Sequence, residues 1–118
     1  MTVALGIGAR SSVSPSQLDQ AAAAALAVAP ATVIATLDRR GAVVRGLAER
    51  LGLPLVMFSA ADLSEVSTPN TVRLTGAPSV AEAAALLAAG PGARLLLPKT
   101  IHAGVAVAVA QLRSRGGR

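Results

Sequence analysis

Short apolar runs in this chain alternate with stretches whose apolar residues recur every three to four positions. The runs are typical of buried strands, and the longer period is typical of helices. Strands are predicted at residues 2–7, 32–37, 54–58, 95–97 and 103–112, with a further short one at 72–74. Helices are predicted at residues 16–29 and 42–51, in a short segment that begins at Ser59, and between Ser79 and Gly90.

The segment between Ser79 and Lys99 carries the clearest start and stop signals. Ser79 is followed three residues later by Glu82, which predicts a capping box in which each side chain satisfies a backbone N–H at the helix start. The GPG sequence that begins at Gly90 ends this helix. Pro98 is then expected to end the apolar LLL strand. Lys99 is thereby placed at the carboxyl edge of a strand, where open α/β sheets form their ligand crevices.

This alternation of strands and helices predicts the α/β class. The expected architecture is a single-domain three-layer α/β/α sandwich with a mixed, largely parallel sheet, in which the final strand is a candidate for antiparallel pairing. The expected domain covers residues 1–112, and residues 113–118 are expected to form a basic flexible tail. Residues 65–71, rich in Ser, Thr, Pro and Asn, are predicted to form a surface loop.

Composition narrows the choice of partner. The 118 residues include 11 basic and 6 acidic side chains, for a formal net charge of +5, which favours anionic partners. Phe58 is the one aromatic residue, so stacking on nucleobases is poorly supported and nucleic acid is not an expected partner. The absence of Cys excludes disulfides and thiolate chemistry.

Membrane insertion and metal binding are not expected either. The longest apolar stretch, at about residues 21–35, is interrupted by Pro30 and lacks the preceding basic residue of a signal peptide. We therefore expect a cytoplasmic protein that does not contact a membrane. A single His and six scattered acids give no metal-ligand spacing and no catalytic triad, so no metal and no other cofactor is expected.

Two candidate sites follow the first two predicted strands. Gly6, Gly8 and Arg10 lie in a GIGAR sequence whose backbone N–H groups could face an anion while Arg10 supplies charge. The alternative is that these glycines only permit a sharp turn. Asp38 follows the second strand and could act as a general base or accept a hydrogen bond from a ligand. It could equally cap the following helix or pair with a neighbouring arginine.

Two further candidates lie in the second half of the chain. Ser59 could bind substrate, although a role as the N-cap of the next helix explains it fully. Lys99, Thr100 and His102 bring a cation, a hydroxyl and an imidazole to the edge of the sheet, a combination that suits an anion or carboxylate pocket. The alternative places Lys99 in solvent and His102 in a connecting loop.

Four sequence blocks occur along the chain in a characteristic order: GIGAR, ATLDRR, LAERLGLPLVMFSAADL, and SVAEAAALLAAG followed by LLLPK. In these blocks the chain resembles the CobE proteins of cobalamin biosynthesis and the C-terminal domain of CbiG, the cobalt-precorrin-5A hydrolase. The resemblance extends over about residues 3–109. It implies an α/β domain that acts in corrin ring construction, in the steps around ring contraction and removal of the extruded two-carbon fragment.

The chain departs from this family at two positions near the candidate site. Ala9 stands where the family usually has Cys, and Thr100 stands where it often has a further Lys. The acidic and basic pair of the second block is present as Asp38 followed by two arginines. The resemblance favours the following residues as substrate-binding: Gly6, Gly8, Arg10, Asp38 and Lys99.

Three functions are compatible with these residues. The first is a protein that binds a carboxylate-fringed precorrin or cobalt-precorrin intermediate and delivers it to pathway enzymes, with Arg10, Lys99 and Arg39 neutralising carboxylates above an apolar cleft. The second is an enzyme that assists opening of a precorrin δ-lactone, with Asp38 or His102 as general base. Lys99 or Arg10 would then stabilise the developing negative charge. The third is a non-catalytic subunit that completes another corrin-pathway enzyme.

Overall fold

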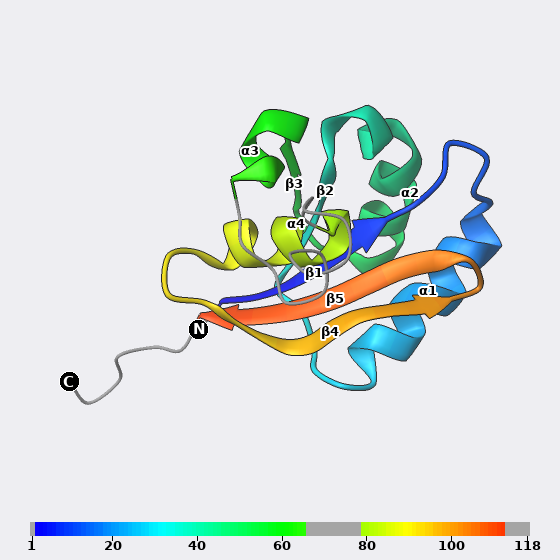
Figure 1. The fold of residues 1–118 in the computed structure, drawn as a ribbon. Coiled ribbons are helices and arrows are strands. Elements are labelled where there is room, and N and C mark those ends of the chain that lie inside the picture. The colour runs from blue at the N-terminus through cyan, green and yellow to red at the C-terminus, as the bar shows by residue number, and fades with distance from the viewer. Residues whose placement is uncertain (1, 66–78, 113–118) are drawn as a thin grey trace.

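In a computed structural model, which describes residues 2–65 and 79–112, the chain folds into a twisted sheet with helices on both faces (Figure 1). The strands are β1 (Thr2–Gly8), β2 (Val33–Leu37), β3 (Leu55–Phe58), β4 (Arg94–His102) and β5 (Val105–Leu112). The helices are α1 (Pro15–Leu26), α2 (Gly41–Leu51), α3 (Ala60–Ser64) and α4 (Val80–Ala89), with a 3-10 turn η1 (Asp38–Arg40).

The described strands form one mixed sheet in the order β3-β2-β1-β5-β4. β1 pairs with β2 in parallel and β2 with β3 in parallel, whereas β5 pairs antiparallel with both β1 and β4. Among the strands of the described residues, β5 therefore alone runs against the others. This arrangement confirms the α/β class, the mixed sheet and the antiparallel final strand.

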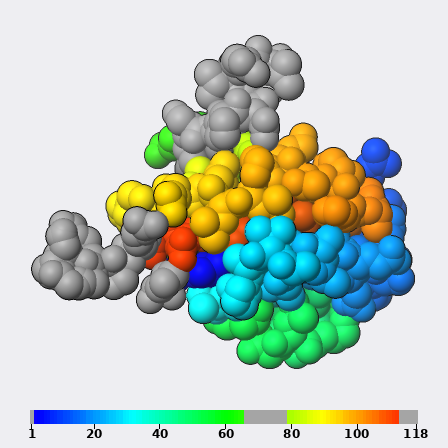
Figure 2. Space-filling view, turned by 90° about the horizontal axis from the view of Figure 1, so that it is seen from below, coloured from blue at the N-terminus to red at the C-terminus, as the bar shows by residue number. Residues whose placement is uncertain are grey.

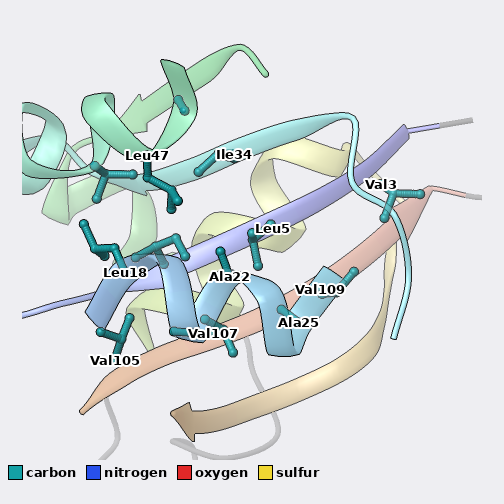
Figure 3. Packing of buried hydrophobic residues seen from close by; sticks show 14 residues of the cluster. Val3, Leu5, Leu18, Ala22, Ala25, Ile34, Leu47, Val105, Val107 and Val109 are labelled. Atoms are coloured by element: carbon teal, nitrogen blue, oxygen red, sulfur yellow. The ribbon is translucent and has the colours of Figure 1, made fainter. Parts of the chain in front are cut away.

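The two faces of the sheet bury residues of different size. Toward α1 and α2 the strands present large aliphatic residues, most of which are visible in Figure 3: Val3, Leu5, Ile7, Ile34, Val105, Val107 and Val109. Toward α4 they present small ones: Ala4, Ala35, Ala108 and Ala110. Apart from Glu82, the buried residues of α4 are also alanines, so helix and sheet approach closely there. Both faces are covered, which confirms the three layers.

Gly6 lies at the closest approach between β1 and α4. A Cβ atom at Gly6 would collide with the carbonyl oxygen of Ala81 and lie 2.9 Å from the backbone nitrogen of Ala85. Glycine is required at this position because the helix backbone occupies the space of a side chain. The glycine of β1 is thus what allows α4 to lie flat on the sheet and to start beside the carboxyl end of β1.

Most predicted elements are present, with small shifts at their ends. α1 begins as expected after Ser14, whose hydroxyl accepts the N–H of Gln17 at 3.1 Å. It ends at Leu26, three residues before its predicted end, because Pro30 disfavours helical backbone at Ala29. The predicted strand at residues 72–74, most of the loop at 65–71 and the tail at 113–118 lie outside the described residues.

The predicted end of the LLL strand is wrong. Pro98 does not end its strand, because β4 continues to His102 and Lys99 therefore lies within the strand rather than at its end. β4 is the outer strand on its side of the sheet, where a proline is tolerated because one edge of the strand makes no ladder hydrogen bonds. The β4–β5 pairing is also irregular on both sides of Leu97.

The β4–β5 hairpin packs against α1 as well as against the sheet. Figure 2, seen from the side of α1, shows the orange hairpin lying along the blue helix, with the green α2 on the helix's other flank. The side-chain amide of Gln17 donates to the carbonyl oxygen of Ala103 at 2.9 Å, in the turn of the hairpin. The hairpin turn is thereby held at the same end of the sheet as the β1–α1 connection (Figure 1).

Candidate functional site

A cleft of about 590 Å³ opens at the carboxyl end of β1. Here the chain leaves β1 toward α1 on one face, while α4 begins on the other face, so the cleft lies where the sheet changes its direction of winding. Such switch points are the usual ligand sites of open α/β sheets. The described residues that line the cleft are Gly8, Ala9, Arg10, Leu37, Arg40, Ser79, Val80, Ala81, Lys99, Ile101, Gly104 and Ala106.

The first wall is the loop that follows β1. The backbone N–H of Val13 donates to the carbonyl oxygen of Arg10 at 3.1 Å, which closes a tight turn and leaves the Arg10 side chain exposed. The guanidinium Nε of Arg40, at the end of η1, donates to the carbonyl oxygen of Ala9 at 2.8 Å. Arg40 thus fixes the loop from the neighbouring strand and places its own charge on the cleft.

The second wall is the start of α4. The hydroxyl of Ser79 accepts the N–H of Glu82 at 3.5 Å, which caps the helix. Val80 and Ala81, the first residues of the helix, line the cleft. The first N–H groups of a helix have no intrahelical acceptor, and the helix dipole gives this end a partial positive charge. This wall therefore favours negative groups.

The third wall is the β4–β5 hairpin. Lys99 and Ile101 are both exposed and lie on β4, and Gly104 and Ala106 follow in the turn and in β5. The carboxylate of Glu82 reaches from α4 to this wall, where its Oε2 accepts the backbone N–H of Lys99 at 2.8 Å. Of the capping box expected from the sequence, the structure shows the half in which Ser79 accepts the N–H of Glu82. The side chain of Glu82, which was expected to bond back to Ser79, reaches β4.

The charged side chains in the described lining of the cleft are all basic. Arg10, Arg40 and Lys99 come from three separate segments, and none of the described residues that line the cleft is acidic. Leu37, Ile101 and the alanines supply apolar surface between these cations. Guanidinium and ammonium groups bind carboxylates through charge-assisted hydrogen bonds. The arrangement can therefore hold a molecule that joins an apolar body to several carboxylates.

The structure brings together Gly8, Arg10 and Lys99 of the candidates expected from the sequence. Gly6 is buried beneath α4 and does not line the cleft, so its surroundings explain it as a packing position. Ser59 caps α3, where its hydroxyl accepts the N–H of Asp62 at 3.1 Å, and it does not line the cleft either.

The two candidate general bases also lie outside the cleft lining. Asp38 opens η1 and is exposed, and His102 is half-buried at the end of β4 rather than in a loop. The interpretation of Asp38 as a helix cap is wrong, because η1 and α2 both begin without a side-chain cap. Within the described residues, no group of three or more His, Asp and Glu side chains could hold a metal ion.

Arg40 is the charged residue of the cleft lining to which the sequence analysis assigned no site role. Its sequence signal is a cation three residues after β2, a strand parallel to β1. Because parallel neighbours end at the same edge of a sheet, a charge after β2 falls beside the loop after β1. Arg39, the neighbour that was considered for carboxylate binding, is exposed and does not line the cleft.

Comparison with protein families shows which family this chain belongs to. The family model described as cobalamin synthesis G C-terminus matches residues 3–110. The chain belongs to this family. The crystal structure of CobE, a protein from the cobalamin (vitamin B12) biosynthetic pathway, matches with a TM-score of 0.76 and 31% identity, over 95% of this chain and 91% of that chain.

Two further structures extend the relationship of this CbiG C-terminal family member. Cobalamin biosynthesis protein chiG from Agrobacterium tumefaciens str. C58 has a TM-score of 0.75 and 31% identity, over 96% of this chain and 100% of that chain. A cobalamin biosynthesis protein G homolog from Sulfolobus solfataricus shares the fold, with a TM-score of 0.72 and 18% identity, over 95% of this chain and 37% of that chain. The comparison with curated proteins found no match.

These matches confirm the resemblance to the CobE proteins and to the C-terminal domain of CbiG. The protein is therefore a member of the cobalamin biosynthesis pathway. Among the described residues of this family member, no helix is long and apolar enough to span a bilayer.

Proposed function

We propose that this protein binds a polycarboxylate precorrin or cobalt-precorrin intermediate in the cleft and delivers it to an enzyme of corrin ring construction, near the ring-contraction steps. The observation that carries the proposal is the convergence of Arg10, Arg40 and Lys99 on one cleft with apolar walls. A corrin precursor has the complementary chemistry, because its macrocycle is apolar and its rim carries carboxylate arms. The cytoplasm is the proposed site of action.

The three cations suit several carboxylate arms better than a single one. Arginine presents a planar fork that can bind a carboxylate through two parallel hydrogen bonds, whereas lysine acts as a point charge on a flexible stem. The Nε of Arg40 already donates a hydrogen bond to the loop after β1, and this bond orients the rest of the guanidinium. The amino end of α4 adds partial positive charge to the same cleft. Leu37 and Ile101 can contact the ring itself.

A binding role has more support than a catalytic one. Lactone opening needs a general base within hydrogen-bond reach of the reacting group. Asp38 and His102, the candidate bases, are not among the described residues that line the cleft. Delivery of the bound intermediate makes other corrin-pathway enzymes the proposed protein partners.

An anaerobic titration of the purified protein with successive precorrin intermediates tests this proposal. The chain has no Trp and no Tyr, so absorbance changes report on the pigment alone. Saturable, salt-sensitive binding without spectral conversion of the pigment is expected. Conversion with release of a two-carbon product would make the protein an enzyme, and absence of binding to every intermediate would refute the carrier role.

Substitution of single cations then locates the site. Arg10→Gln and Lys99→Gln are each expected to weaken binding about five- to tenfold, since each removes one charge-assisted contact in a partly solvated cleft. Arg94→Gln is the matched control, because Arg94 is the first residue of β4, the strand that carries Lys99, and does not line the cleft. Calorimetry measures the affinities. Equal losses in all three variants would mean that net charge, not the cleft, attracts the ligand.

A further inference from the structure

We propose that Glu82 is a positioning residue that sets Lys99 on the wall of the cleft by holding its backbone N–H. This inference rests on the proposed binding of carboxylates at the cleft. Glu82 is the one polar residue of α4, a helix otherwise made of alanine, leucine and valine. It is fully buried, with 0% of its surface exposed. A buried carboxylate requires hydrogen-bond partners, so the groups that bond to Glu82 are held in place by it.

The first step concerns the backbone of β4 around Lys99. Leu97 pairs with Val109 of β5 and Thr100 pairs with Val107, so two residues of β4 oppose the single Ala108. This two-to-one count is a β-bulge, a feature that redirects side chains and is frequent beside functional sites. The two residues in the bulge are Pro98, which has no N–H, and Lys99.

The second step concerns the backbone N–H of Lys99, which the bulge removes from the hydrogen bonds between β4 and β5. The amide of Lys99 donates to Glu82 Oε2 at 2.8 Å, so its one hydrogen is engaged by α4 rather than by β5. The N–H of Glu82 in turn donates to the hydroxyl of Ser79, which lines the cleft. Glu82 therefore connects the helix wall of the cleft to the hairpin wall, and it fixes where the backbone of Lys99 stands relative to the start of α4.

Glu82 cannot assist the binding of anions through its charge. A carboxylate close to a site for anions opposes their binding, so removing it would strengthen binding if charge were its main effect. A positioning role predicts the opposite result, provided that the replacement cannot accept the N–H of Lys99. Gln and Leu resemble Glu in size and neither is charged, but only Gln keeps an acceptor oxygen. The two variants therefore separate geometry from charge.

The experiment compares Glu82→Gln with Glu82→Leu in titrations with uroporphyrin I, a tetrapyrrole with eight carboxylates. Glu82→Gln is expected to bind within about twofold of the unmodified protein or more tightly, because the acceptor remains. Glu82→Leu is expected to bind about five- to tenfold more weakly, as much as Lys99→Gln, because the lysine is no longer held. Equal affinities for the two Glu82 variants would overturn the inference.

A double variant tests whether the effect passes through Lys99. In Glu82→Leu combined with Lys99→Gln, the loss is expected to stay within about twofold of that in Lys99→Gln alone, because both changes remove the same contact. Additive losses would mean that Glu82 acts on the cleft by another route. A residue that only stabilised the fold would lower the unfolding temperature without this coupling.

Hydrogen exchange keeps the inference testable if Glu82→Leu does not fold. The Lys99 amide is expected to be protected in the unmodified protein and in Glu82→Gln, and bound uroporphyrin is expected to slow its exchange further. Exchange of this amide at the rate of an unprotected one would overturn the inference. If the unmodified protein does not bind uroporphyrin, the same variants are titrated with the precorrin intermediate that it does bind. Failure to bind any of these ligands would remove the proposed function together with the inference. Binding with equal effects in both Glu82 variants would remove the inference alone.

Discussion

Gly6 and Gly8 are two residues apart in the same strand, but they have different neighbours. Gly6 faces α4, whose backbone fills the space that a side chain would need. Gly8 lines the cleft, and a Cβ there would lie 3.5 Å from the side chain of Ala106, an ordinary van der Waals distance. The sequence motif that joins them therefore combines a packing requirement with a site position.

Gly6→Ala is expected to destabilise the fold strongly, whereas Gly8→Ala is expected to be tolerated. The methyl group at Gly6 must displace the helix backbone at Ala81, which is expected to lower the free energy of unfolding by about 3 kcal/mol. For a domain of this size, the unfolding temperature should fall by about 10 °C. Gly8→Ala should leave the unfolding temperature within about 2 °C. Similar melting temperatures for both variants would show that α4 can move away from β1.

The sequence could predict a side chain of the site only where that residue closely follows a predicted strand. Arg10 follows the first apolar run closely, so its place at the carboxyl edge of the sheet was predictable. The role of Arg40 depends on which strand lies beside β1, and the sequence does not state strand order. The bond between Glu82 and Lys99 was not predicted for a different reason. The spacing of Ser79 and Glu82 predicted a local capping box, of which the structure shows only the bond from the N–H of Glu82 to Ser79.

Among the elements, the β4–β5 hairpin combines a structural irregularity with a place on the cleft. His102 pairs with Val105, which leaves a two-residue turn of Ala103 and Gly104. Both turn residues have positive φ, 53° at Ala103 and 79° at Gly104. A two-residue turn of this kind favours Asn or Gly at its first position, and alanine is strained there.

Ala103→Gly is therefore expected to stabilise the protein by about 0.5–1 kcal/mol, despite the added freedom of the unfolded chain. Ala23→Gly is the matched control, because Ala23 is exposed within α1 and glycine there should destabilise by about 1 kcal/mol. Urea unfolding of both variants measures the two effects. Destabilisation by Ala103→Gly would indicate that the positive φ of Ala103 causes little strain in this fold.

Element type was easier to predict than element extent. Apolar runs and helical periods identified the described strands and helices, because both signals are local. The end of β4 was mispredicted since Pro98 stops an inner strand but not an outer one, and the outer position is a property of the whole sheet. The end of α1 was predicted too late because alanine-rich periodicity continues up to Pro30.

At the scale of the whole molecule, small residues on one face of the sheet create the site. Alanines on the strands and on α4 bring helix and sheet close together, so the amino end of α4 stands beside the carboxyl end of β1. Large aliphatic residues on the other face anchor α1 and α2, and α1 in turn holds the hairpin turn through Gln17. The walls of the cleft are thus fixed by the cores on both faces.

The predicted tail at residues 113–118 should be dispensable for this assembly. Within the described residues the last strand ends at Leu112, and the family model ends at residue 110. Arg113, Arg115 and Arg118 contribute three of the eleven basic residues. Shortening the chain to residues 1–112 is expected to change the unfolding temperature by no more than about 2 °C.

Ligand binding by the shortened chain distinguishes a general attraction of charge from the cleft itself. At about 0.15 M salt, where charges are screened within about 8 Å, its affinity for a precorrin intermediate should stay within about twofold of the full chain. At low salt the full chain should bind more tightly, since its three additional cations then attract the polyanion. The deficit of Lys99→Gln should persist at both salt concentrations, because the proposed binding mode places that lysine in contact with the ligand. A tenfold loss at the higher salt concentration on shortening would assign the tail arginines to the binding site.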